Sequence, residues 1–354
     1  MSNLLPLAKP PGEVCILRLS ALGDATHVLP VVRAIQSHWP DTRITWIIGK
    51  LEHQLLSGVQ DIDFIPFDKR GGWAAVRGLK NSLRGRRFDV LLHMQVSARA
   101  NLLSRLVRSR IRLGWDRKRS RDGHQWFINH SVETVAQQHQ VDGFLEFARA
   151  IGVPVPSPEW RLPISEDSRQ WAESQLPGDQ PTLMISPCSR HRERNWRSEY
   201  YAQVADHAIR EMGMRVALIG GPGELEKATA TEIEACMATE PINLVGRDTL
   251  PQSPALMEKA SVMITPDSGP AHIASAIGIP VLGLYAATWS RRSGPYNSLD
   301  LCVDRFAEAA RMYRHAAPDT LRWGTRIHVD GVMDLIRPQD VIEVLRGQAA
   351  DSGV

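Results

Sequence analysis

Short apolar runs alternate along the chain with longer stretches whose apolar residues recur every three or four positions. The stretches between these runs have the periodicity of helices, and the first of them predicts one helix from a turn at Gly23 to about Ser37. In the first half, runs rich in β-branched and apolar residues predict buried strands at 13–20, 42–49, 62–67 and 88–94. Strands that alternate with helices at this spacing predict a parallel, doubly wound sheet.

The same alternation starts again after a proline-rich stretch at 154–163, which is typical of a linker. In the second half we expect strands at 182–187, 215–221, 242–246, 261–266 and 279–286. The pattern therefore predicts an α/β protein of two Rossmann-like domains, residues 1–160 and 161–354, with the last helix free to pack back on the first domain. Ligands of such sheets bind at the carboxyl ends of strands, so we expect the site in a cleft where the two domains face each other.

Composition agrees with a globular protein in the cytoplasm. The chain has 354 residues, 43% of them hydrophobic and 23% charged, and no apolar run approaches the roughly 20 residues of a membrane-spanning helix. The cysteines are far apart and form no C-x-x-C pair, which favours reduced thiols over disulfides or a zinc site, at Cys15, Cys188, Cys236 and Cys302.

The charge is unevenly distributed. Residues 1–165 contain 23 Lys and Arg against 14 Asp and Glu, a net charge of +9, so the remainder carries −6 of the total of +3. Eight of the cations lie within 105–121, where only Asp116 opposes them. Such a run is usually a solvated face, but its place in the basic half favours an anionic partner, either phosphorylated or a membrane surface. Nucleic acid is not expected, because no stacking aromatic platform accompanies the charge.

Two aspartates follow predicted strands at the start of helices. Asp24 lies in the sequence RLSALGDATH after the first strand, and capping of the next helix and catalysis are equally good interpretations of it. Asp267 lies in TPDSGPAH, where Gly269 permits close approach of a ligand and Pro270 suits a first helical turn. The amides of that turn favour a phosphate, so we expect Asp267 itself to cap the helix or to accept a hydrogen bond from a sugar hydroxyl.

Three further segments follow strands. The loop SPCSRHRERNW at 186–196 holds three arginines and a histidine, and guanidinium groups suit a diphosphate, although charged loops are commonly just solvated. Glu224 ends the cluster GGPGE, which is not a dinucleotide fingerprint; its carboxylate could bind ribose hydroxyls or favour a helix N-terminus. The loop at 286–296 could close over a nucleotide or be an ordinary connection.

Taken together and in this order, these segments resemble glycosyltransferase family 9, the lipopolysaccharide heptosyltransferase family. The resemblance runs from about residue 13 to the end, except that 305–330 matches no pattern of the family, and Arg18 and Arg194 stand where the family often has lysine. It rests on four segments of this chain: SALGD at 20–24, RNW at 194–196, DSGPAH at 267–272 and SGPY at 293–296.

The resemblance implies a GT-B architecture and an inverting, metal-independent transfer of a sugar from a nucleotide donor, with ADP-heptose favoured, and no cofactor. It implies an anionic, lipid-linked acceptor of the lipopolysaccharide inner core, which we expect to bind the N-terminal domain at the inner leaflet through Arg117, Lys118, Arg119 and Arg121. By the same resemblance Asp24 is the general base. The C-terminal domain holds most of the donor-binding residues, which are expected to be Arg18, Ser189, Arg194, Glu224, Asp267, Ser268, Gly269 and His272.

Two other functions compete with this interpretation. A nicotinamide-dependent oxidoreductase also uses Rossmann-like halves, but it needs G-x-G-x-x-G after an early strand, where this chain reads SALGDA. An inactive sugar-binding paralogue is the non-enzymatic alternative, and the presence of Asp24, Arg194 and Asp267 together argues against it.

Overall fold

A computed structural model describes residues 4–352 of the chain. The chain forms two compact units, Met1–Pro163 and Ile164–Val354, and the proline-rich stretch at 154–163 ends the first of them. Each unit is built on one six-stranded sheet in which every neighbouring pair of strands is parallel.

The sheet of unit 1 has the order β3-β2-β1-β4-β5-β6, which is the doubly wound order of a Rossmann fold. Its strands are β1 (Glu13–Leu17), β2 (Arg43–Gly49), β3 (Ile62–Phe67), β4 (Phe88–His93), β5 (Ser109–Gly114) and β6 (His130–Ser131). β1 and β4 are the central pair. The strand order reverses between them, and this reversal leaves a crevice at their carboxyl ends.

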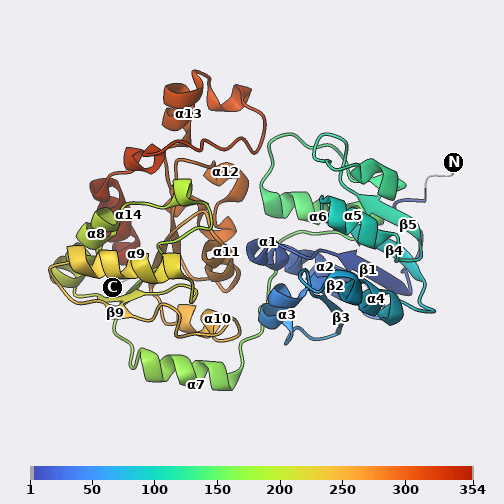
Figure 1. Cartoon of the computed structure of the whole chain (residues 1–354), viewed down its shortest axis with the longest axis horizontal. Coiled ribbons are helices and arrows are strands. Elements are labelled where there is room, and N and C mark those ends of the chain that lie inside the picture. The colour runs from blue at the N-terminus through green and yellow to red at the C-terminus, as the bar shows by residue number, and fades with distance from the viewer. Residues whose placement is uncertain (1–3, 353–354) are drawn as a thin grey trace. The chain divides into compact units, whose positions relative to one another are not determined.

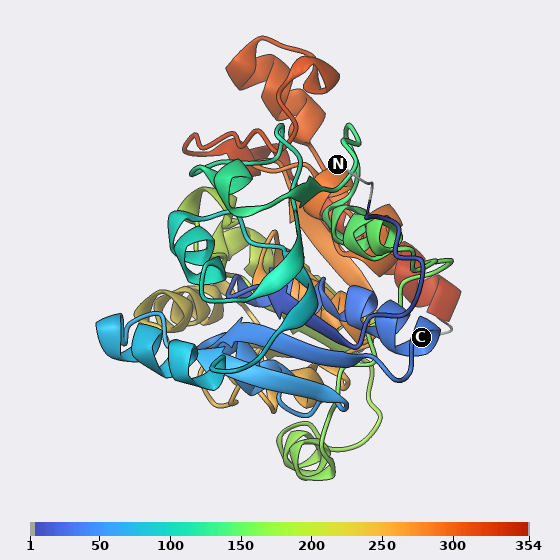
Figure 2. The same cartoon turned by 90° about the vertical axis from the view of Figure 1, so that its right-hand side faces the viewer.

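Helices cover both faces of this sheet, with cyan α4 and teal α5 on one side and blue α2 and green α6 on the other (Figure 2). Alternate β1 residues such as Cys15 and Leu17 face α4 and α5, because successive side chains of a strand point to opposite faces. The helical segments are α1 (Leu22–Thr26), α2 (Leu29–His38), α3 (Lys50–Leu56), α4 (Gly72–Ser82), α5 (Ala98–Ser104), η1 (His124–Phe127) and α6 (Gln140–Ile151).

Unit 2 repeats this plan. Its strands are β7 (Thr182–Ile185), β8 (Arg215–Leu218), β9 (Ile242–Asn243), β10 (Val262–Pro266), β11 (Val281–Tyr285) and β12 (Val303–Asp304). Their order, β12-β11-β10-β7-β8-β9, is the same doubly wound order traced from the other edge. The reversal therefore falls between β7 and β10, which pair at the centre.

On one face of this second sheet lie α8, α9 and α14, seen at the left of Figure 1. α14 packs on α8, and its Val341 and Leu345 are fully buried in the core of unit 2. The helical segments of unit 2 are α7 (Glu166–Gln175), η2 (Arg192–Arg194), α8 (Ser198–Met212), α9 (Glu224–Cys236), α10 (Ser253–Met257), α11 (Gly269–Ala276), α12 (Ser290–Ser293), η3 (Tyr296–Leu301), α13 (Phe306–Arg314), η4 (Pro318–Thr320), η5 (Val332–Leu335) and α14 (Pro338–Ser352).

The α/β fold class expected from the sequence is confirmed, with three local corrections. The single helix expected up to Ser37 is two helices, because α1 ends at Thr26 and α2 begins at Leu29. The strand expected at 242–246 is only Ile242–Asn243. Residues 109–114, which belong to the basic run, form strand β5, in which Ile111 and Leu113 are buried.

Candidate active site

Asp24 lies just after the carboxyl end of β1, beside the point where the strand order of unit 1 reverses. It is the third residue of α1, and its Oδ2 accepts a hydrogen bond from the amide of the N-cap residue, Ala21, at 3.1 Å. The capping role is therefore real, since Asp24 makes the reciprocal bond of a capping box. Capping engages only one of the two carboxylate oxygens, so it leaves the catalytic interpretation intact.

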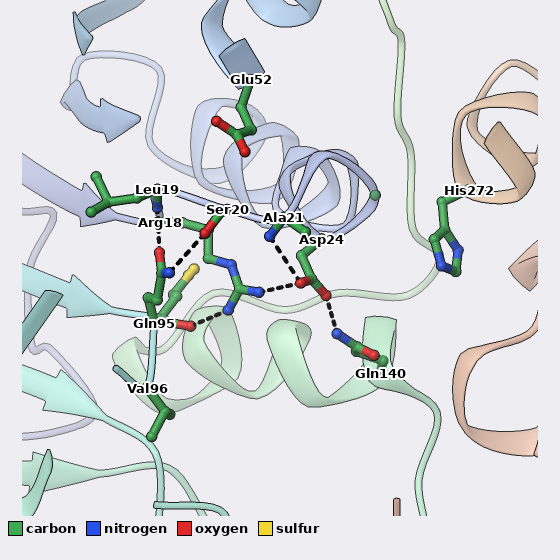
Figure 3. Close-up of polar contacts among 12 residues, drawn as sticks. Arg18, Leu19, Ser20, Ala21, Asp24, Glu52, Gln95, Val96, Gln140 and His272 are labelled. Atoms are coloured by element: carbon green, nitrogen blue, oxygen red, sulfur yellow. Dashed lines mark hydrogen bonds and ion pairs between the residues drawn. The ribbon is translucent and has the colours of Figure 1, made fainter. Parts of the chain in front are cut away.

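Arg18 is ion-paired with Asp24, with 2.5 Å between its Nη2 and the aspartate Oδ2 (Figure 3). The guanidinium is largely buried, donates from Nη1 to the carbonyl of Met94 at 2.7 Å and stacks over the ring of Phe144 at 5.1 Å. This fork bonds one carboxylate and one carbonyl at once, which fixes the direction of Asp24. Arg18, assigned to the donor from the sequence, is thus engaged inside unit 1.

Two glutamines belong to this site, one bonded to Asp24 and one bonded to the turn before it, and neither was found from the sequence. Gln140, the first residue of α6, donates from Nε2 to Asp24 Oδ1 (Figure 3). Gln95, just past β4, accepts from the Leu19 amide at 2.5 Å and donates to Ser20 Oγ at 3.0 Å, which holds the turn before α1. No sequence pattern links these residues to Asp24, because Gln140 is 116 positions away.

The turn before Asp24 is also supported by Lys69 and by the end of β2 at Gly49. Lys69 donates to the Leu19 carbonyl at 3.2 Å and is ion-paired with the buried Glu52 at 2.8 Å. A Cβ atom on Gly49 would lie 2.2 Å from the Leu19 carbonyl oxygen and 2.1 Å from Glu52 Oε2. Only glycine fits at this position, so the end of β2 is shaped around the segment that carries Asp24.

The second site lies in unit 2, where β7 and β10 end side by side. Arg194, in η2, and Asp267, directly after β10, form an ion pair with 2.9 Å between Nη1 and Oδ2. The two residues are 8% and 7% exposed. Arg194 Nε is buried and has no hydrogen-bond partner within residues 4–352. Such a buried guanidinium with an unused N–H is well suited to a polar ligand group.

The surroundings of Asp267 correct its expected role as a helix cap. The N-cap of α11 is Ser268, whose hydroxyl is 2.9 Å from Thr265 Oγ1, and Gly269 is the first helical residue. The Asp267 carboxylate instead lies beside Arg194, with His272 Nε2 4.0 Å from its Oδ1. Within residues 4–352 no side chain caps the N-terminus of α11, so its first amides can face a phosphate.

Ser189 and Ser293 link three loops at Asp267. Ser189, after β7, donates from Oγ to the Asp267 carbonyl at 3.0 Å, and its amide donates to Asn195 Oδ1 at 2.6 Å. Ser293, in α12, donates to Asp267 Oδ2 at 3.4 Å. From the sequence, Ser293 was included only as the first residue of SGPY, in the loop after β11, and was given no role at the site. The loop after β11 therefore contributes a side chain to this site.

Glu224 is exposed at the start of α9, and its nearest cation is Lys227 at 3.8 Å. It borders a groove of about 730 Å³, which is also lined by Arg192 and Asn195 from the basic loop. The groove thus places the carboxylate proposed for ribose and the loop proposed for phosphate on one surface of unit 2.

The basic run at 105–121 does not form one continuous docking face. Arg112 is half-buried and bonds the backbone carbonyls of Ser104, Val107 and Phe127. Arg119 is ion-paired with Asp116 and stacks over Trp115 at 4.8 Å. Burial acts to raise the pKa of Asp116, but the hydrogen bonds and charge of Arg119, together with the hydrogen bond from the Lys118 amide, lower it overall.

Other members of the run remain accessible. Arg117 and Lys118 are exposed, and Arg121 is exposed although its Nε donates to the Val96 carbonyl at 3.1 Å. Of the four cations expected at the acceptor, Arg119 thus has a structural task, and the other three can meet a ligand.

Within residues 4–352 no group of three or more His, Cys, Asp or Glu side chains is placed to hold a metal ion. No described helix has the length and apolar character needed to cross a membrane.

Comparison with known proteins shows which family this chain resembles. Residues 76–317 match the model of the family described as glycosyltransferase family 9 (heptosyltransferase). The chain is 40% identical over 332 residues to the lipopolysaccharide core heptosyltransferase OpsX of Haemophilus influenzae, which covers 94% of this chain and 95% of that protein.

Solved structures agree in fold. A glycosyltransferase family 9 protein from Veillonella parvula superposes with a TM-score of 0.80 at 21% identity, over 96% of this chain and 98% of the other. The Escherichia coli ADP-heptose lps heptosyltransferase II gives a TM-score of 0.74 at 21% identity, over 97% and 100%. The family assignment rules out the nicotinamide-dependent oxidoreductase considered from the sequence. The chain belongs to glycosyltransferase family 9 and is a glycosyltransferase of the GT-B type.

Proposed function

We propose that this glycosyltransferase moves heptose from ADP-heptose to an acceptor of the lipopolysaccharide inner core, with inversion and without a metal ion. The Haemophilus relative, named a lipopolysaccharide core heptosyltransferase, supports the acceptor class. The Escherichia coli neighbour, named for ADP-heptose, supports the donor. The observation that carries the proposal is the Asp24 carboxylate, held on both oxygens by Arg18, Ala21 and Gln140 at the end of β1.

In the proposed reaction, Asp24 accepts the proton of the acceptor hydroxyl as its oxygen attacks the anomeric carbon. The bond from that carbon to the diphosphate breaks, and attack from the opposite side inverts the configuration. The leaving diphosphate gains negative charge, which Arg194 and the amides at the start of α11 stabilise. Asp267 orients Arg194 and, on this proposal, accepts a hydrogen bond from the donor sugar.

We further propose that the N-terminal unit binds the acceptor at the cytoplasmic face of the inner membrane. Trp126 is 79% exposed and Leu102 66% exposed on η1 and α5, which pack against each other. Arg105 joins this surface, since it donates to the Trp126 carbonyl at 3.1 Å. Exposed tryptophan beside arginine suits the boundary between lipid headgroups and acyl chains.

The test is transfer by an Asp24→Asn variant, which keeps the size of the side chain and removes its basicity. We expect kcat to fall by roughly 100- to 10,000-fold, with donor affinity nearly unchanged. An Asp24→Ala variant controls for the amide introduced by Asn, and circular dichroism checks the fold. Normal transfer by a folded Asp24→Asn or Asp24→Ala protein would leave only the capping role. Failure of the wild type to release ADP from ADP-heptose, alongside turnover of another nucleotide sugar, would overturn the donor assignment.

A further inference from the structure

The stretch from β12 to η5 in unit 2 is the part of the chain that no sequence motif explained. It is fastened to the loop after β11 by aromatic packing: Phe306, at the start of α13, stacks on Trp289 with ring centroids 5.3 Å apart and planes 15° apart. Trp323 lies 5.5 Å from the same indole. α13, in orange-red, is visible in both views (Figures 1 and 2). The stretch is therefore a built part of unit 2.

Near its end, the stretch contacts the loop after β11 through Ile327. The amide of Ile327 donates to the Ala287 carbonyl at 2.9 Å, and its side chain is fully buried in the core of unit 2. The residues on either side, Arg326 and His328, are exposed. Burial of Ile327 thus fixes the backbone here and leaves an arginine and a histidine on the surface.

These two residues lie beside the basic loop after β7. The rings of His328 and His191 are 5.7 Å apart, and His191 belongs to the turn that carries Arg194, whose amide donates to the His191 carbonyl at 3.0 Å. Burial lowers the pKa of His191, and nearby cations lower it further: Arg194, Arg326, His328 and Arg190. We name this group, Arg190, His191, Arg194, Arg326 and His328, the cationic rim.

The cationic rim is positively charged although its unit as a whole is acidic. Residues 166–354 carry a net charge of −6, yet three arginines and two histidines gather here. Two acids lie near the rim: Asp267, which is ion-paired with Arg194, and Glu193 of the same loop. The three arginines of the rim outnumber these two acids. Such a concentration attracts an anion of more than one negative charge.

We propose that Arg326 and His328 complete a diphosphate-binding site whose other side is the loop 189–194. The proposal rests on the proposed function and deepens it, because ADP-heptose, like every nucleoside-diphosphate sugar, presents a diphosphate to the transferase that uses it. Arg194, buried and fixed by Asp267, holds one side of the group, and Arg326 supplies a second guanidinium from the stretch that sequence motifs did not explain. Burial and the neighbouring cations lower the pKa of His191, and a bound diphosphate brings negative charge to this ring, so His191 takes up a proton when the diphosphate binds.

The experiment uses inorganic pyrophosphate and ADP as separate probes of the full-length protein, titrated by calorimetry near pH 7. We expect Arg326→Gln to weaken the binding of both by at least about tenfold. Arg326→Lys, which keeps the charge and loses the fork, should fall between. Arg311→Gln, an exposed arginine on α13 in the same stretch, is the matched control and should bind as the wild type does. Circular dichroism verifies that each variant is folded.

Proton uptake provides a readout that a purely structural role would not change. Titrations in buffers of different ionisation enthalpy should show protons taken up by the wild type and fewer by His191→Gln. Unchanged pyrophosphate and ADP affinity in folded Arg326→Gln, with binding lost in Arg194→Gln, would overturn the proposal and leave the proposed function standing. A second outcome is also informative. If the wild type transfers no sugar from ADP-heptose but Arg326→Gln still binds pyrophosphate more weakly, the cationic rim is supported and the donor assignment is refuted.

Discussion

A buried histidine pair in unit 1 should make the protein sensitive to acid. His93, the last residue of β4, and His124, in η1, both lie 3.0 Å or less from Asn101 Oδ1, and their rings are 4.5 Å apart. His124 Nε2 accepts from the Trp115 amide at 3.1 Å, so Nδ1 carries its proton and the ring is neutral. The next residue after His93, Met94, holds Arg18 through its carbonyl, so this cluster supports the Asp24 site.

Burial sets the size and sign of the effect. It lowers the pKa of His124 from 6.5 to about 4, and burial, the neighbouring His124 and Arg112 lower the pKa of His93 well below its ordinary value. Because the unfolded chain binds protons that the folded protein does not, the free energy of unfolding falls as the pH drops below about 6.5. For His124 alone the loss is about 2 kcal/mol between about pH 7.5 and pH 5, and about 3 kcal/mol near pH 4.

Urea unfolding followed by circular dichroism, at about pH 7.5 and pH 5, measures this loss. His124→Gln is the informative variant, because an amide can donate to Asn101 and accept from the Trp115 amide without titrating. We expect it to remove about 2 kcal/mol of the difference between the two pH values. His38→Gln, at an exposed histidine of α2, is the control and should keep the full difference. An equal pH dependence in wild type and His124→Gln would refute the reasoning.

Three further predictions concern the reaction. Gln140→Glu should move the acidic limb of the kcat profile to higher pH, because a second carboxylate opposes ionisation of Asp24; an unmoved limb would show that Gln140 does not act on the base. Replacing the exposed Arg117 and Lys118 with Gln should weaken binding to anionic liposomes at least about tenfold at moderate salt with ADP affinity unchanged, and a loss of ADP affinity instead would reverse the domain assignment. Transfer should persist in EDTA, and a lost rate restored by Mg²⁺ or Mn²⁺ would disprove metal independence.

Local pattern was enough to locate the elements that carry the two sites. The apolar runs at 13–20 and 261–266 predicted strands that the structure places at Glu13–Leu17 and Val262–Pro266. A strand buried on both faces needs a continuous apolar run, and parallel sheets expose function at strand ends, so Asp24 and Asp267 could be singled out from the sequence alone. Whether these residues act in catalysis and donor binding stays a prediction.

Strand β5 was not predicted from the sequence, because its arginines hid the strand pattern. Strand β5 alternates Arg110 and Arg112 with buried Ile111 and Leu113, and its arginines made the segment look like a docking face. Only the tertiary structure shows that Arg112 is committed to backbone carbonyls and Arg119 to Asp116. A charged residue has the same appearance in a sequence whether its partner is solvent, a carbonyl or a ligand.

The partners of the site residues were decided by strand order. Gln140 meets Asp24 across 116 positions, and Ser293 meets Asp267 across 26, because the turn after each strand faces whatever the fold brings beside it. The same holds for His328 and His191, which come from stretches without a shared pattern. Sequence periodicity reports which face of an element is buried, since that depends on neighbours a few residues away. Which distant side chain lies against that face depends on topology, and this only the folded chain determines.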